Sequence, residues 1–205
     1  MNTTTPQFAA HCFDNMPLEE LKKRITPSWD PARTKLHMKM LGIPPGTRSV
    51  LEIGCGIGRL GREICKRKAV KRYTGIAASH DMIKEAPGYC TSKKAEFAES
   101  QTDGNFLFQL KSYDFVFAFL IFQHILDTAT VDRLVCSMCR WVKPGGSVMV
   151  QLLAHDEKPG HALWVYYDPG EMVNYMAALG VTVHVEKLSS RWVAVRGVKE
   201  VSNDK

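Results

Sequence analysis

The segment SVLEIGCGIGRLG, residues 49–61, joins a mostly apolar stretch to a turn crowded with glycine. Glycine has no Cβ, so such a turn reaches positive φ angles easily and lets the backbone approach a ligand closely. Read from Gly54, the pattern is G-x-G-x-G. Read from Gly56, it is G-x-G-x-x-G, the dinucleotide signature. Either reading predicts a strand before the turn and a helix after it, beginning near Arg59.

Predicted strands and helices alternate from Ser49 onward. The run YDFVFAFLIF, residues 113–122, is apolar without alternation, which is typical of a central strand buried on both faces. The motif KPGG, residues 143–146, predicts a tight turn into the next strand. Further strands are expected at 49–53, 72–78, 95–100 and 147–153, and further helices at 79–86, 128–142 and 171–179. The alternation predicts an α/β fold with a mostly parallel sheet and helices on both faces.

The two ends of the chain complete this organisation. Residues 181–188 and 191–197 alternate and are parted only by two serines, which predicts a C-terminal antiparallel hairpin. The first 47 residues are predicted to be helical, with Asp30 as an N-cap and Gly42 as a stop. Because no repeat or linker interrupts the chain, we expect a single domain over 1–205, made of an N-terminal helical cap (1–47) and a Rossmann-like core (48–200).

Composition excludes some classes of protein. The six cysteines are scattered, the first residues lack a signal-peptide pattern, and no run approaches a membrane span. These features predict a cytoplasmic protein with reduced thiols and no membrane partner. Much of the net charge of +6 lies between Arg62 and Arg72. No aromatic residues are interleaved as stacking platforms, so a solvated helix face is favoured over a nucleic-acid patch.

The surroundings of the glycine turn distinguish its two readings. A dinucleotide site requires an acidic residue about 20 positions on, at the end of the second strand, to bind the ribose hydroxyls. That strand ends in GIAA, and Ala77 holds the expected position. Glu52, just before the turn, would repel a diphosphate but attract an ammonium or sulfonium group. The pattern therefore favours a cationic cofactor over a dinucleotide.

At this point the sequence resembles the class I S-adenosylmethionine-dependent methyltransferases, over nearly all of residues 48–197. VLEIGCGIGRL resembles their first motif, and YTGIAASHDMIKEA their second-strand segment. YDFVFAFLIFQHI is similar to the fourth strand and its exit, and CRWVKPGGSVMVQ to the turn into the fifth strand. The resemblance implies a Rossmann-like, seven-stranded, mostly parallel sheet. It also implies S-adenosyl-L-methionine as cofactor and S-adenosyl-L-homocysteine as product.

The resemblance also implies roles for particular residues. The turn would hold the methionine part of the cofactor against bare backbone, and Glu52 would order the turn or receive the cofactor's ammonium. Ser79 and Met82 would flank the ribose and adenine, and Phe119 and Leu120 would line the methyl-donor channel. The complete set of predicted cofactor-binding residues is Glu52, Gly54, Cys55, Gly56, Gly58, Arg59, Ala77, Ser79, Met82, Gln101, Phe119 and Leu120.

Two positions depart from the family pattern. Ala77 replaces the acid that normally accepts hydrogen bonds from both ribose hydroxyls. Gln101 stands where the family often has an acid contacting the adenine amino group. Charge-assisted hydrogen bonds contribute about 1.5–3 kcal/mol each, so losing the ribose pair would weaken cofactor binding by one to a few orders of magnitude. Ser79, His80 or water would have to substitute.

His124, in FQHI after the central strand, is the predicted catalytic residue, as a general base or as a donor that orients the acceptor. The alternative is a capping or packing role, and the sequence favours neither. His155, Asp156 and His161 follow the fifth strand, but their spacing matches no metal-ligand pattern, so no metal is expected. Trp29 could cover the acceptor pocket or only anchor the N-terminal helices.

Three functions follow from this reading. The first is a methyltransferase that acts on an oxygen or nitrogen atom of a small-molecule acceptor. The second is a methyltransferase acting on RNA or protein, with the basic stretch 62–72 steering the substrate. The third is a binding or scaffold protein that keeps the methyltransferase fold with weakened cofactor affinity, as Ala77 would permit.

Overall fold

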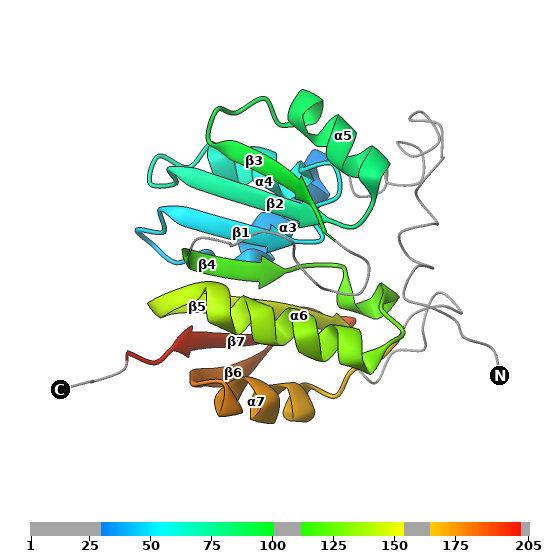
Figure 1. The fold of residues 1–205 in the computed structure, drawn as a ribbon, viewed down its shortest axis with the longest axis vertical. Helices are drawn as coiled ribbons and strands as arrows, with labels where there is room; N and C mark the ends of the chain where they lie inside the picture. Colours follow the sequence, from blue (N-terminus) through cyan, green and yellow to red (C-terminus); the bar gives the residue numbers. More distant parts are fainter. Residues whose placement is uncertain (1–29, 101–111, 154–164, 202–205) are drawn as a thin grey trace. The chain divides into compact units, whose positions relative to one another are not determined.

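A computed structural model describes residues 30–100, 112–153 and 165–201 (Figure 1). The chain divides into two compact units, residues 1–102 and 103–205. Among the helices within the described ranges, none is long and apolar enough to cross a membrane.

Three parallel strands form the sheet of the first unit, in the order β3-β2-β1. They are β1 (Ser49–Ile53), β2 (Arg72–Ala77) and β3 (Ala95–Glu99). All five residues of β1 are buried, whereas β3 is half-exposed. The register aligns Glu52 with Gly75, and Gly75 with Phe97, so these three residues lie on one face of the sheet.

The helices of this unit begin at the capping residues that the sequence predicts. In α3 (Pro31–Leu41), the Asp30 side chain accepts a hydrogen bond from Ala32 N, and Gly42 ends the helix in the left-handed conformation. In α5 (His80–Tyr89), Ser79 Oγ accepts from Met82 N at 3.4 Å. The short helix α4 (Arg59–Cys65) begins directly after the glycine turn. All three helix predictions are confirmed.

Four strands form the sheet of the second unit, in the order β4-β5-β7-β6. Strands β4 (Tyr113–Ala118) and β5 (Val142–Leu153) are parallel. Strand β7 (Trp192–Lys199) pairs antiparallel with β5 and with β6 (Val181–Lys187), as the hairpin prediction requires. The helices are α6 (Thr128–Trp141) and α7 (Pro169–Ala178), and a 3₁₀ turn, η1, spans Phe122–His124.

Two strand boundaries differ by several residues from the predictions, and helix α5 extends to Tyr89, three residues beyond its predicted end. The apolar run 113–122 is a strand only as far as Ala118 and continues into η1, because apolar character reports burial and not conformation. The KPGG motif is not a turn before a strand but a bulge inside β5. Tyr113 pairs with Val142 and Phe115 pairs with Ser147, so residues 143–146 lie opposite a single residue of β4. Gly145 takes a φ of 74° within this bulge.

Candidate functional site

The loop after β1 has a backbone that only glycine adopts without strain. Gly54, Gly56 and Gly58 have φ angles of 79°, 54° and 79°. The N–H groups of Gly54 and Cys55 both donate to Ile76 O, at 2.7 and 3.0 Å, which ties the loop to the carboxyl end of β2. A Cβ at Gly58 would lie 2.7 Å from the ring of Phe97. The sequence therefore produces a bare, fixed backbone at the edge where parallel sheets bind ligands.

A buried carboxyl group stands immediately before this loop. Glu52 is 3% exposed, and its Oε2 accepts a hydrogen bond of 2.6 Å from the hydroxyl of Tyr73 on β2. Burial raises the pKa of Glu52 to about 7, while the Tyr73 hydroxyl and the Arg59 charge act in the opposite direction. A cationic ligand near Glu52 would favour the ionised carboxylate, because an opposite charge stabilises the charged form.

The pocket that holds Tyr73 depends on two glycines. A Cβ at Gly61 on α4 would lie 2.4 Å from the Tyr73 ring, and a Cβ at Gly75 would lie 2.9 Å from its hydroxyl oxygen. The ring also packs edge-on against Phe97 of β3, with the centroids 5.9 Å apart. Tyr73 is thus held by α4, β2 and β3 in the position from which it donates to Glu52.

Two other predicted residues of the loop region direct their side chains elsewhere. Arg59 hydrogen-bonds α3, through Nη2 to His37 Nδ1 at 3.0 Å and through Nη1 to Thr34 Oγ1 at 3.3 Å. Burial and the Arg59 charge lower the pKa of His37 to about 4, so His37 is neutral at pH 7. The Cys55 side chain is buried, and a Cβ at Gly75 would lie 2.8 Å from its Sγ, so Cys55 gives the loop only its backbone.

The structure brings Met82 to the glycine loop. A Cβ at Gly56 would lie 3.4 Å from Met82 Sδ, so the thioether that the resemblance places beside the ribose and adenine lies next to the loop. Ser79, also predicted to contact the cofactor, uses its hydroxyl to cap α5. Ala77 ends β2 and is buried, 7% exposed, and offers no hydrogen-bond acceptor from its side chain.

These residues suit S-adenosylmethionine in shape and charge. The three glycines of the loop present backbone without side chains, the buried carboxyl of Glu52 comes directly before the loop in sequence, and Met82 supplies an apolar contact. The acceptor for the ribose hydroxyls is missing at position 77 and has to come from another residue. The residues of the first unit therefore fit the methionine and adenine parts of the cofactor.

In the second unit, Phe119 and Leu120 follow the end of β4 as predicted. Phe119 is buried, and Leu120 is half-exposed with a φ of 60°. No other non-glycine residue in the described ranges has a positive φ. The N–H of Leu120 donates to Gln151 Oε1 at 2.6 Å, and Gln151 is fully buried in β5. A hydrogen bond from the neighbouring strand thus holds a strained exit from β4, and strain of this kind is often found at functional sites.

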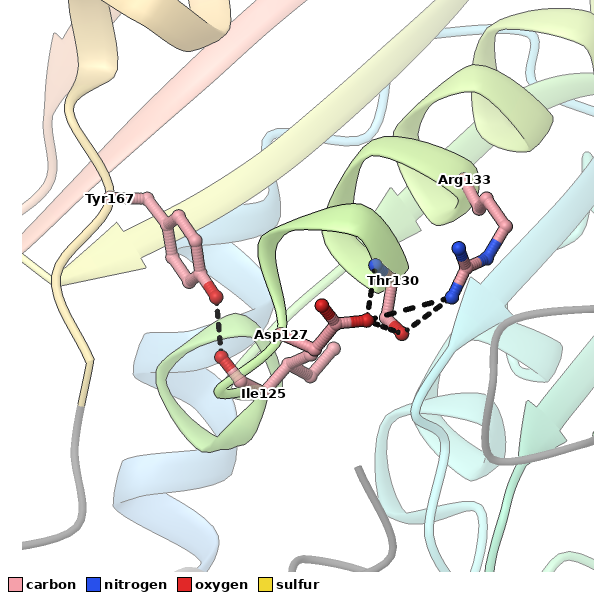
Figure 2. Close-up of polar contacts among 5 residues, drawn as sticks. All are labelled: Ile125, Asp127, Thr130, Arg133 and Tyr167. Atoms are coloured by element: carbon pink, nitrogen blue, oxygen red, sulfur yellow. Dashed lines mark hydrogen bonds and ion pairs between the residues drawn. The ribbon is translucent and has the colours of Figure 1, made fainter. Parts of the chain in front are cut away.

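His124, the predicted catalytic residue, closes the turn η1 and is half-exposed. Its Nε2 lies 3.2 Å from the amide nitrogen of Gln123, which is 2% exposed. If the Gln123 amide donates, His124 Nε2 is the acceptor and carries no proton. The neighbouring backbone is anchored, because the Tyr167 hydroxyl donates to Ile125 O (Figure 2).

The helix that follows His124 has a well-ordered start. Asp127 Oδ2 accepts hydrogen bonds from Thr130 N at 2.9 Å and from Thr130 Oγ1 at 2.6 Å (Figure 2). These bonds lower the pKa of Asp127. Arg133 donates to Thr130 Oγ1 and lies 3.6 Å from the Asp127 carboxylate. Tyr167 therefore holds the backbone at Ile125, and the N-cap at Asp127 holds the start of α6 two residues later.

Several predicted residues lie outside the described ranges, and sequence reasoning missed others. Gln101, Trp29, His155, Asp156 and His161 are outside. Tyr73 and Gln151 were not predicted, because their roles depend on strand register and on side-chain direction. A weak signal existed for Gln151, which is a polar residue within an apolar run, since buried polar groups require partners.

Comparison with known proteins shows a family match over part of the chain and a likeness of fold. Residues 50–146 match the family model of a methyltransferase domain. A demethylmenaquinone methyltransferase of Tropheryma whipplei (strain Twist) is 29% identical over 132 residues, covering 63% of this chain and 52% of that protein. A sterol 24-C-methyltransferase of Clavispora lusitaniae is 27% identical over 160 residues, covering 76% of this chain and 40% of that protein. The chain thus spans about half the length of the curated relatives it matches, or less.

Solved structures share the fold at low sequence identity. The structure of a DhpI–SAH complex aligns with a TM-score of 0.72 at 20% identity, covering 98% of this chain and 99% of that chain. The predicted fold class is confirmed: a Rossmann-like, seven-stranded, mostly parallel sheet with a C-terminal antiparallel hairpin. Residues 50–146, just under half of the chain, therefore match the methyltransferase-domain family, and the chain shares the Rossmann-like fold of the DhpI–SAH complex.

Proposed function

We propose that this protein transfers a methyl group from S-adenosylmethionine to an oxygen or nitrogen atom of a small-molecule acceptor. The observation that carries the proposal is the glycine loop, which has three positive φ angles and follows the buried carboxyl of Glu52 within the family match. When bound, S-adenosylmethionine supplies a methyl group already activated by its sulfonium. The protein then has to align the acceptor and, where needed, remove its proton.

In this proposal Gly54, Gly56 and Gly58 bind the methionine part of the cofactor, and Met82 contacts the adenine. Phe119 and Leu120 line the channel of the methyl donor. His124 is the general base for an acceptor that must lose a proton on methylation. Where Nε2 accepts from the Gln123 amide, that hydrogen bond has to break before Nε2 can take the proton of the acceptor. We further propose that residues 1–205 act as a single methyltransferase-like domain.

Two observations favour a small acceptor over RNA or protein. The relatives from Tropheryma whipplei and Clavispora lusitaniae are named for demethylmenaquinone and a sterol. The basic stretch 62–72 runs from α4 to the first residue of β2, and therefore lies at the amino end of that strand. Ligands of parallel sheets bind at the carboxyl ends. Within the stretch, Arg62 stacks over the Tyr89 ring at 5.2 Å and Lys66 pairs with Glu63 at 2.6 Å.

The first test is thermal unfolding with S-adenosylmethionine, S-adenosylhomocysteine or NAD. A ligand at 100 times its Kd adds about 2.7 kcal/mol to the free energy of unfolding, which raises the Tm of a chain of this size by roughly 5–10 °C. We expect this shift with the first two ligands only. A shift with NAD alone would overturn the choice of cofactor, and no shift at millimolar methyl donor would favour the scaffold function.

The second test addresses His124. Isotope-labelled methyl donor and mass spectrometry would identify the acceptor from a panel of compounds. The panel offers a hydroxyl oxygen, an amine nitrogen or a nucleophilic carbon as the atom to be methylated. With that acceptor, we expect H124Q to lower kcat by about 10²–10⁴-fold, the usual contribution of a general base, with little change in the Kd of S-adenosylhomocysteine. An unchanged kcat and pH profile would assign His124 to packing or capping instead.

A further inference from the structure

The last residues of β2 and β3 place a carboxylate beside Ala77. In the parallel pairing of these strands, Ala77 lies directly opposite Glu99. Partners in a parallel register lie on the same face of the sheet, and neighbouring strands are about 4.8 Å apart. A glutamate side chain can span one such spacing. The carboxylate that Ala77 lacks therefore has a counterpart on the adjacent strand.

The face on which Glu99 lies is the face of the glycine loop. Phe97, two residues before Glu99, contacts the loop, since a Cβ at Gly58 would be 2.7 Å from its ring. Side chains two residues apart in a strand lie on the same face. By register, Glu52, Gly75 and Phe97 form one row across the sheet, and Ala77 and Glu99 form the next row toward the carboxyl ends of the strands.

A histidine from the start of α5 fixes the Glu99 side chain. His80 Nδ1 lies 2.8 Å from Glu99 Oε2. Both side chains are accessible, 72% exposed for His80 and 48% for Glu99, so a ligand can reach the pair. The bond and the charge of Glu99 raise the pKa of His80. Because a carboxylate oxygen accepts more than one hydrogen bond, the pair with His80 leaves acceptor capacity for a ligand.

We infer that Glu99, oriented by His80, accepts the ribose hydroxyls of the methyl donor in place of the missing acid at position 77. This inference rests on the proposed function. It adds that the carboxylate that binds the ribose comes from β3, the strand next to β2. Ala77 contributes only a methyl group to this row, so it offers no side-chain acceptor of its own. In this assignment Glu99 binds the cofactor, and His80 is a positioning residue.

The test is isothermal titration with two probes, S-adenosylhomocysteine and its 2′-deoxyribose analogue. Losing a charge-assisted bond costs about 1.5–3 kcal/mol, so we expect E99Q to weaken S-adenosylhomocysteine binding by roughly 10–100-fold. The deoxy analogue, which lacks one hydroxyl, is expected to lose much less affinity on the same substitution. Adding A77D to E99Q restores the carboxylate on the neighbouring strand and is expected to recover most of the affinity.

Glu96 provides a matched control on the same strand. It is exposed and lies on the opposite face from Glu99, since the two are an odd number of residues apart. We expect E96Q to bind both probes as the unmodified protein does. For the positioning role, H80N is expected to weaken S-adenosylhomocysteine binding less than E99Q, and to have no effect in the E99Q background.

The possible outcomes separate this inference from the proposed function. Unchanged binding by E99Q, or an equal loss for both probes, would show that Glu99 does not contact the ribose and would overturn the inference alone. Failure of A77D to recover affinity in the E99Q background would also count against it. If the unmodified protein bound neither probe, the proposed function and this inference would both be wrong.

Discussion

At the scale of single residues, Glu52 carries a carboxyl group that is almost entirely removed from water. Its carboxyl is buried before the glycine loop, and the hydroxyl of Tyr73 donates to it at 2.6 Å. Two glycines make room for that tyrosine. A buried carboxyl with one neutral donor is costly to ionise, and a nearby ligand cation would lower that cost. Ionisation of Glu52 therefore couples the stability of the fold to pH and to the charge of a bound ligand.

The first prediction concerns the pH dependence of stability. The pKa of Glu52 is about 7 in the folded chain, against an ordinary value of 4.5. Between these values the unfolded state loses its proton first, so the free energy of unfolding falls as pH rises through this window. E52Q cannot ionise and still accepts the Tyr73 hydrogen bond. From pH 4 to pH 8, the stability of E52Q should gain roughly 3 kcal/mol relative to the unmodified protein.

Urea unfolding at several pH values measures this difference. Parallel pH profiles for the two proteins would mean that Glu52 keeps an ordinary pKa in the folded state. Addition of S-adenosylhomocysteine should narrow the gap at pH 8, since its ammonium favours the ionised carboxylate.

A second prediction at this scale concerns Gln151. Its fully buried side chain accepts from the Leu120 N–H and donates to Leu152 O, so Q151L removes two hydrogen bonds and leaves the Leu120 N–H without this acceptor. The expected loss is about 1–3 kcal/mol of unfolding free energy. M149L, two residues earlier in β5 and equally buried, conserves volume and should cost less than about 1.5 kcal/mol. Equal losses for both variants would assign the effect to packing.

At the scale of elements, the position of α4 depends on close contact between a helix and a strand. Gly61 lies in α4 where the Tyr73 ring of β2 occupies the place of a side chain. Glycine lowers helix propensity by about 1 kcal/mol relative to alanine, so the helix is locally less stable than it could be. The contact between Gly61 and the Tyr73 ring compensates for this lower helix propensity, because it lets the Tyr73 hydroxyl reach Glu52.

Two helical glycines test this balance. A Cβ at Gly61 would lie 2.4 Å from the Tyr73 ring, whereas a Cβ at Gly88 in α5 would meet nothing within 4 Å. We expect G61A to lower the free energy of unfolding by about 1–3 kcal/mol through overpacking. G88A should be neutral or should raise stability by up to about 1 kcal/mol. Thermal or denaturant unfolding measures both, and a stabilising G61A would show that Tyr73 has room to move.

At the scale of the whole molecule, charge and topology have separate consequences. The net charge of +6 is concentrated near the amino end of β2, and the glycine loop is at the carboxyl end of β1. In a parallel sheet these are opposite edges. A positive stretch at the far edge is suited to solubility or to weak contact with polyanions, but it is badly placed to deliver a substrate to the loop.

We therefore expect the double variant K68E/K71E to leave kcat/KM for a small acceptor within about twofold of the unmodified value. Both lysines are exposed, and substitutions at such positions usually change stability by less than about 0.5 kcal/mol. The measurement is methyl transfer at low and moderate ionic strength. A large loss at low salt only would support a polyanionic acceptor steered by this stretch.

The sequence by itself determined the order and type of nearly every described element. Glycine spacing, apolar runs and caps such as Asp30 and Ser79 act locally, so they can be read from neighbouring residues. It could not set the end of β4 or the bulge at residues 143–146, because an apolar run is compatible with strand or turn. The sequence also predicts that the glycine loop and Glu52 belong to a cofactor site.

Only the tertiary structure decided how residues on different strands meet. Tyr73 and Glu52 are 21 positions apart, and Ala77 and Glu99 are 22 apart; strand register alone makes each pair neighbours. A shift by one residue would turn every side chain of a strand to the other face. The folded sheet therefore decides which carboxylate lies beside Ala77. Burial on the two faces of the sheet sets the strand register, and no local sequence pattern does.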